Sequence, residues 1–194
     1  MRAPSGLASR VLAIVGTLVL VVGAWRDPRW VDRPWALLIM VAAAALFRMR
    51  AVSITKFSSL NVVQVVAMAG AIAAGISPTA LAVYAGVLLA DWLHHAKPFN
   101  VAWINASREL MALYGAYGLY AAIALQGPAA AAGELTAETI PGVAVFLLAY
   151  FVLSRALQYY TLLVRDKLFP EERALILRYE VIVFVASSGV VLVI

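Results

Sequence analysis

The sequence predicts an all-α fold, a polytopic transmembrane bundle of six or seven helices. Of the 194 residues, 64% are hydrophobic and only 13% are charged. A soluble domain of this length has too little interior to hide so many apolar side chains. Long apolar runs recur along the whole chain, and they lack the period-2 alternation of half-buried strands. We therefore expect one membrane domain over residues 1–194, without a soluble domain.

The individual crossings follow from the apolar runs. A helix needs about 20 residues to cross the hydrocarbon layer, so several runs must borrow flanking residues. The first run is expected to be a retained helix, because no cleavage site of small residues precedes the charged stretch WRDPRWVDRP. The seven runs are Val11–Trp25, Trp35–Phe47, Asn61–Ile76, Thr79–Leu93, Val101–Leu125, Gly142–Val164 and Val181–Ile194.

The connections between the runs have distinct compositions. The segment from Gly75 to Pro78 predicts a tight turn between the third and fourth helices. The longest loop is predicted at residues 126–140. Residues 165–180 are charged but keep several leucines, so we expect an interfacial amphipathic connector there, separate from the last crossing.

Lysine and arginine in the short loops predict the orientation. Placing the N-terminus in the cytoplasm puts most of these cations on the cytoplasmic side, as the positive-inside bias requires. The first outer loop, with Arg26, Arg29 and Arg33, is the exception. We expect a multi-pass protein of the bacterial cytoplasmic (inner) membrane. The same bias explains the net charge of +5, so no nucleic-acid partner is expected.

Motifs of the common enzyme classes are missing from the sequence. The chain has no cysteine, which removes disulfides, thiolate catalysis and cysteine-ligated metals. It also has no Walker loop, GxSxG, HExxH or CxxC motif. The sequence therefore predicts a protein that is not an enzyme and that holds no metal.

Charged residues in the apolar run Val101–Leu125 mark a candidate site. Glu109 and Arg155 each lie about nine residues from the cytoplasmic end of their helix, at a depth of about 13 Å, which predicts an interhelical pair. Other polar residues fall at comparable depth. The predicted polar cluster, a candidate ligand or switch site, comprises Asn61, Gln64, Asn105, Arg108, Glu109, Arg155 and Gln158.

Two interpretations of this cluster stay open. Ionisable residues within a membrane normally face the bundle, where they form a ligand pocket, an ion path or a signalling switch. The alternative, which the pattern favours slightly, is a satisfied polar network that only fixes helix register, with Arg108 reaching toward the headgroups.

His94 and His95 form a second candidate site. Asp91 and His95 are spaced i, i+4 and can share a helix face, but no further ligands complete a metal site. One of the histidines could ligate a haem or a chlorophyll-type pigment axially. The alternative is that both anchor the helix at the membrane interface, and no other cofactor is expected.

Three stretches carry a resemblance to a known family. VSITKFSSLNVVQVVAMAGAIAAGISPTALAVYAGVLLADWL is followed by the FN dipeptide and by LMALYGAYGLY, and later by YFVLSRALQYYTLLVRDKLFPEERALILRYE. This order resembles the N-terminal multi-helix membrane sensor domain of bacterial signalling proteins of the HD-phosphohydrolase, diguanylate cyclase or kinase type. The charged residues Arg108, Glu109 and Arg155 depart from the family's pattern. The output domain that follows the sensor in that family is absent from these 194 residues.

The resemblance implies a sensory, ligand-responsive membrane domain. The helix arrangement is also distantly similar to the substrate-binding components of vitamin uptake transporters, which implies a small-molecule pocket. The main alternative to the sensor is an accessory structural subunit of a larger respiratory or photosynthetic complex that contacts a pigment, and the transporter-like binder is the third possibility. The expected partners are the lipid bilayer and either other membrane protein subunits or further copies of the chain.

Overall fold

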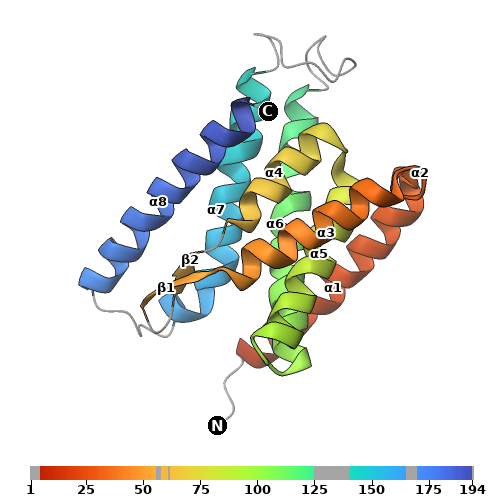
Figure 1. Cartoon of the computed structure of the whole chain (residues 1–194). Helices are drawn as coiled ribbons and strands as arrows, with labels where there is room; N and C mark the ends of the chain where they lie inside the picture. Colours follow the sequence, from red (N-terminus) through yellow and green to blue (C-terminus); the bar gives the residue numbers. More distant parts are fainter. Residues whose placement is uncertain (1–4, 56–57, 61, 125–139, 165–169, 194) are drawn as a thin grey trace.

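The computed structural model describes residues 5–55, 58–60, 62–124, 140–164 and 170–193. Over these ranges the protein is a bundle of α-helices with one short π-helix and one small hairpin, so the all-α prediction is confirmed (Figure 1). The helices are α1 (Ser5–Arg26), α2 (Arg29–Asp32), α3 (Pro34–Met49), α4 (Val63–Ala73), α5 (Ile76–Leu89), the π-helix η1 (Ala90–His94), α6 (Phe99–Ala124), α7 (Ile140–Val164) and α8 (Pro170–Val193).

Within the described ranges, four helical segments are long and apolar enough to cross a membrane. They are Gly6–Arg26, Ile76–His94, Ile140–Tyr159 and Pro170–Val191. Helices α3 and α4 are apolar but shorter, and the 26-residue α6 is not among the four. Helix α6 contains polar and charged residues, which lower its mean hydropathy. It nevertheless lies inside the bundle, where it packs on α1, α5 and α7. The expectation of six or seven crossings therefore stays a prediction.

The short hairpin between α3 and α4 was not predicted. Strand β1 (Val52–Thr55) pairs antiparallel with β2 (Ser58–Leu60), with Val52 opposite Leu60 and Ser53 opposite Ser59. The strands are rich in β-branched and small residues, but each is too short for a clear period-2 signal. Both strands pack on α8.

Helix α8 also differs from the prediction. The sequence predicted an amphipathic connector at residues 165–180 and a separate crossing from Val181. The structure instead has one continuous helix from Pro170 to Val193, while residues 165–169 lie outside the described ranges. No proline or glycine interrupts the chain between Pro170 and Gly189, so nothing ends the helix at Glu180.

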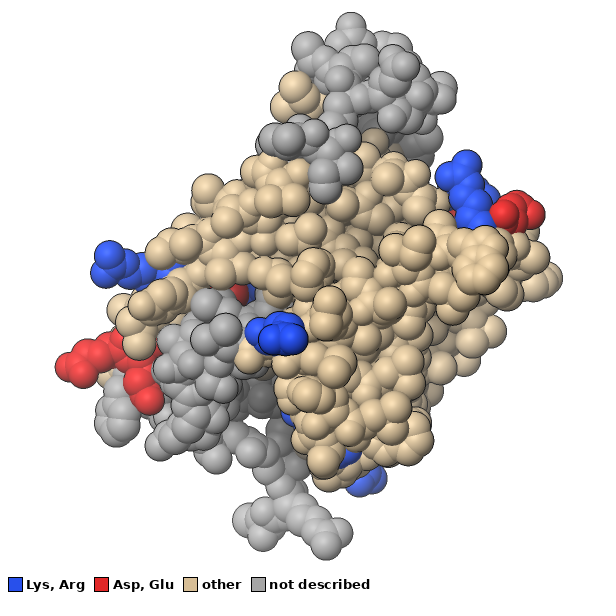
Figure 2. All heavy atoms as spheres, in the orientation of Figure 1, with Lys and Arg blue, Asp and Glu red and all other residues tan. Residues whose placement is uncertain are grey.

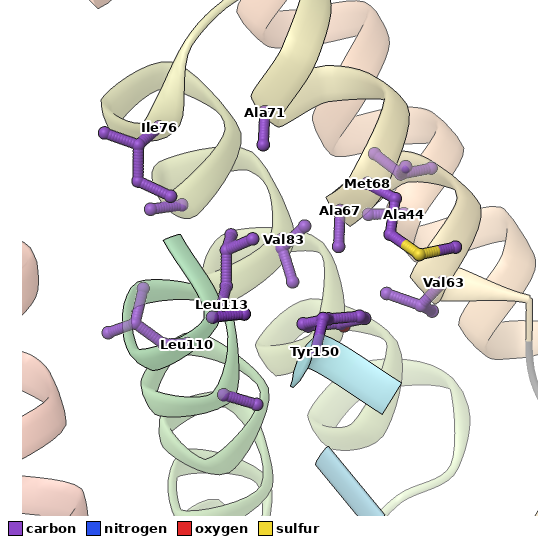
Figure 3. Packing of buried hydrophobic residues seen from close by; sticks show 14 of the residues in the cluster. Ala44, Val63, Ala67, Met68, Ala71, Ile76, Val83, Leu110, Leu113 and Tyr150 are labelled. Carbon is purple, nitrogen blue, oxygen red and sulfur yellow. The ribbon is translucent and has the colours of Figure 1, made fainter. Parts of the chain in front are cut away.

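The apolar core lies where α4, α5, α6 and α7 meet. Figure 3 shows side chains from these helices around one interior, among them Ala67, Val83, Leu113 and Tyr150. Small residues allow the helix backbones to approach closely. A Cβ on Gly86 of α5 would lie only 2.6 Å from the Cβ of Ala44 on α3.

The predicted turn between α4 and α5 is present at Gly75. Its φ of 92° lies in the left-handed region that glycine tolerates best. Arg29 from α2 covers this glycine and donates two hydrogen bonds of 2.7 Å to Asp27. Arg29 lowers the pKa of the Asp27 carboxyl, chiefly through its side-chain hydrogen bond, with a smaller contribution from the Ser77 backbone. The first loop thus packs on the start of α5.

Candidate functional site: two buried polar networks

The first buried network is centred on Asp91, which lies in the π-helix η1 and is fully buried. Arg48 near the end of α3 binds its carboxylate with two hydrogen bonds, Nε to Oδ1 at 2.9 Å and Nη2 to Oδ2 at 3.0 Å. Such a bidentate pair fixes the guanidinium and carboxylate planes relative to each other. Arg48 is itself only 8% exposed.

Two further side chains complete the Asp91 network. Lys97 donates from Nζ to Oδ1 at 2.9 Å, and Asn105 of α6 donates from Nδ2 to Oδ2 at 2.7 Å. The network therefore ties α3, η1, the following loop and α6 together. A π-helix widens one turn and displaces its side chains from the regular α-helical positions. Here that turn holds Asp91 against donors from three other segments.

The second network is centred on Glu109 of α6, which is 4% exposed. The Tyr150 hydroxyl of α7 donates to Oε2 at 2.9 Å, and the Gln158 amide of α7 donates to Oε1. Both donors are neutral groups. Glu109 is thus hydrogen-bonded on both oxygens inside the bundle.

Arg155 links Glu109 to two other helices. Its Nη1 donates to Gln158 at 2.6 Å, and its Nη2 donates to Gln64 of α4 at 3.1 Å. Its Nε lies 2.9 Å from Oε2 of Glu180 on α8, which forms an ion pair. The side chain of Glu180 is 2% exposed, so this pair is shielded from solvent.

Helix α8 is held by three additional contacts. Tyr159 donates to Glu180 at 2.7 Å, and Gln64 donates to Ser187 at 2.9 Å. The rings of Phe151 and Phe184 stack with centroids 4.5 Å apart. The Glu109 network joins α4, α6, α7 and α8, and it comprises Gln64, Glu109, Tyr150, Arg155, Gln158, Tyr159, Glu180 and Ser187.

The predicted polar cluster separates into three parts. Gln64, Glu109, Arg155 and Gln158 come together in the Glu109 network. Asn105 instead binds Asp91. Arg108 is apart from both networks and donates to Ser9 of α1 at 3.4 Å, while Asn61 lies outside the described residues.

The predicted direct pair between Glu109 and Arg155 is not formed among the described residues. Gln158 lies between the two, accepting from Arg155 and donating to Glu109. The ion-pair partner of Arg155 is Glu180. The predicted depth along the helices was similar for Glu109 and Arg155, and both belong to one network. The prediction of a direct pair did not consider Glu180, because the sequence pattern assigned that residue to the interfacial connector.

His94 ends the π-helix η1, and His95 follows it directly. The rings are 5.0 Å apart and edge-to-face. The Nε2 atom of His95 forms a 3.1 Å hydrogen bond with the Arg48 carbonyl, while His94 is exposed. No group of three or more potential metal ligands occurs among the described residues. Pigment ligation stays a prediction.

Several site residues were missed from the sequence. Arg48 and Lys97 were counted only as loop cations, and Glu180 was placed in the connector. A charge count gives a usable signal, because a carboxylate at the end of an apolar run, such as Asp91, needs a nearby cation. No comparable signal marks Tyr150 or Ser187.

Comparisons with known proteins yield no relative of this chain. No protein-family model, no curated protein and no solved structure matches it.

Proposed function

We propose that the chain is a non-enzymatic integral membrane module of the sensor type, in which the Glu109 network is the ligand-responsive or switch site. The observation that carries this proposal is the buried link from Glu109 through Gln158 and Arg155 to Glu180. It places charged groups from three helices inside a bundle whose exterior is largely apolar. Such groups are costly in lipid and mark functional positions by default.

The surface composition supports residence in a membrane. Large apolar side chains are exposed along α1, α3, α7 and α8, including Leu18, Ile39, Val152 and Val185. Figure 2 shows a broad uncharged area on one face, with most charged side chains toward its edges. A soluble monomer rarely exposes an apolar surface of this extent. Trp25 and Trp35 flank the first loop at 82% and 76% exposure, as expected for an interfacial aromatic belt.

The attachment of α8 supports a switch. α8 packs on α4 and on the two strands, and α7 reaches it through long side chains. Arg155 contacts Glu180 directly and Ser187 through Gln64, so two of the polar contacts of α8 involve one guanidinium, while Tyr159 supplies another. A ligand that competes for Arg155 would weaken both at once. A bacterial inner-membrane location with a cytoplasmic N-terminus is part of the same proposal.

A thermal-shift screen of small polar ligands on the purified chain in lipid nanodiscs tests the proposal. We expect at least one ligand class to raise the Tm of the wild type and to have no effect on Arg155→Gln. Arg178→Gln is the matched control, because Arg178 is exposed on α8. An equal response in Arg155→Gln would show that ligands bind elsewhere. Migration of the native chain with a large complex would favour the accessory-subunit alternative.

A further inference from the structure

Arg108 of α6 belongs to neither buried network. Among the described residues it forms a single polar contact, a hydrogen bond of 3.4 Å from Nη2 to the Ser9 hydroxyl of α1. This distance is long for a hydrogen bond, and a neutral hydroxyl does not balance a guanidinium charge. Arg48, Lys97 and Arg155 instead each contact a carboxylate. Arg108 is therefore a partly buried cation to which the described part of the chain supplies no countercharge.

The backbone of Arg108 lies on a side of α6 that faces away from the bundle. Val101 and Gly115 each lie seven residues from Arg108, and Leu119 lies eleven residues from it, so the four share one face of the helix. The three neighbours on this face are exposed. The preceding residue, Ser107, is buried and donates to a backbone carbonyl of α1 at 3.3 Å. Arg108 thus lies where the exposed face of α6 meets α1.

The guanidinium of this arginine points toward the starts of both helices. Helices α1 and α6 run in the same direction, because Ser107 packs against Gly16 and, further along, Tyr114 packs against Gly23. The guanidinium contacts Ser9, which is about two turns nearer the start of α1 than Gly16. With the cytoplasmic N-terminus proposed above, this contact lies toward the inner leaflet. A long cationic side chain at the edge of a membrane reaches the headgroups in this way.

The charges near this contact are positive. Helix α1 contains no acidic residue, and α6 contains none before Glu109, which accepts its hydrogen bonds from α7. Arg10 directly follows Ser9 and is exposed. The first turns of α1 also expose large apolar side chains, with Leu7 at 72% and Val11 at 51%. A ligand that fits this end of the α1–α6 contact therefore combines a negative group with apolar chains.

We propose that Arg108 and Ser9 bind the phosphate of an anionic phospholipid from the inner leaflet. A phosphodiester gives the guanidinium a charged acceptor that can take two parallel N–H···O bonds. The inner leaflet is rich in such lipids. A headgroup with net negative charge fits better than a zwitterionic one, because a zwitterion brings its own cation to a site that is already positive. The acyl chains cover the exposed apolar side chains beside it. The inference rests on the membrane residence in the proposed function and does not require the switch.

Native mass spectrometry of the chain released from nanodiscs tests the site. The discs contain phosphatidylcholine, with phosphatidylglycerol as the minor component. We expect the wild type to retain phosphatidylglycerol several-fold more often than Arg108→Gln does. Arg178→Gln is the matched control, because it removes an exposed cation of α8, and it should retain the lipid like the wild type. Equal retention in Arg108→Gln and the wild type would overturn the proposal.

Thermal unfolding in nanodiscs identifies the source of the phosphate. Phosphatidylglycerol should raise the Tm of the wild type above its value in phosphatidylcholine alone, and this rise should be absent in Arg108→Gln. Inorganic phosphate added to the phosphatidylcholine discs should have no effect, because it has no acyl chains to hold it at a lipid-facing surface. A rise of the same size with inorganic phosphate would show that the site binds free phosphate, and it would overturn the lipid assignment.

Arg108→Lys keeps the test decisive if Arg108→Gln does not fold. Lysine preserves the charge but cannot form the two parallel bonds to one phosphate. We expect this variant to have the wild-type Tm in phosphatidylcholine alone and to retain phosphatidylglycerol less often than the wild type. Retention equal to that of the wild type would show that a positive charge alone suffices, and the specific site at Arg108 would be excluded.

Failure of the lipid site is distinct from failure of the proposed function. A chain that does not float with vesicles after reconstitution is not a membrane protein, and neither proposal then holds. A chain that inserts and responds to a small ligand through Arg155, but retains phosphatidylglycerol no better than Arg108→Gln, keeps the proposed function and loses the lipid site.

Discussion

At the scale of single residues, two carboxylates within the bundle have different partners. Asp91 accepts hydrogen bonds from two cations and an amide, while Glu109 accepts them only from neutral donors. The first arrangement resembles a permanent clamp, since both oxygens of Asp91 accept from a cationic side chain. The second leaves the carboxylate separated by one amide group from the cation Arg155. Both arrangements lie near the centre of the chain, yet only the second connects to α8.

The Asp91 clamp gives a prediction for stability. Asp91→Asn leaves the buried Arg48 guanidinium without a countercharge, and we expect it to lower the free energy of unfolding by about 3–5 kcal/mol. Lys97→Gln removes a cation whose side chain is 34% exposed, and it should cost about 0.2–1 kcal/mol. Unfolding of both variants in mixed micelles, followed by circular dichroism, measures the difference. Equal losses would contradict the clamp.

Residue-level prediction from the sequence succeeded where depth was the deciding variable. Gln64, Glu109, Arg155 and Gln158 were placed at one level and do meet. It could not identify partners, because depth does not fix which way a side chain points around its helix. Glu180 was left out because the sequence pattern placed it in the interfacial connector, although it pairs with Arg155.

At the scale of elements, the apolar runs in the sequence predicted where the long helices lie. They did not predict the short hairpin or the π-helical turn. The turn at Gly75 was predicted from Gly and Pro spacing and is present. The β1–β2 hairpin and the π-helix η1 were not predicted, because each is only a few residues long and has no periodic signal. Helix α8 continues through Glu180, whose buried partner Arg155 composition alone does not reveal.

Close packing of α3 on α5 gives a second prediction. In Gly86→Ala the new Cβ on α5 would lie 2.6 Å from the Cβ of Ala44 on α3. It would also lie 2.9 Å from two backbone atoms of α3. We expect a loss of about 1–3 kcal/mol from overpacking. Gly118→Ala is the control, because nothing lies within 4 Å of its new methyl group. It should be neutral or stabilise α6 by about 0.5–1 kcal/mol. Denaturation midpoints compare the two, and a Gly86→Ala protein as stable as wild type would be inconsistent with this contact.

At the scale of the whole molecule, the structure consists of a packed body and one peripheral helix. Helices α3 to α7 form most of the apolar core, to which α1 adds Leu20 and α8 adds Val191, and α1 packs on α5 and α6. Helix α8 lies at the edge of the bundle opposite α1 (Figure 1). Its buried side chains are few, and two of them, Glu180 and Ser187, belong to the Glu109 network. We therefore expect this network to control the position of α8.

The most direct measurement of that control is a distance between spin labels at Leu18→Cys and Leu177→Cys, recorded by pulsed electron paramagnetic resonance in lipid bilayers. Both positions are exposed, at 59% and 62%, on α1 and α8. With the network intact we predict one narrow distance distribution. Adding Arg155→Gln should broaden or lengthen it, whereas adding Arg108→Gln, which affects only the α1–α6 contact, should not. The same narrow distribution in Arg155→Gln would show that α8 is held without the network and would contradict the account.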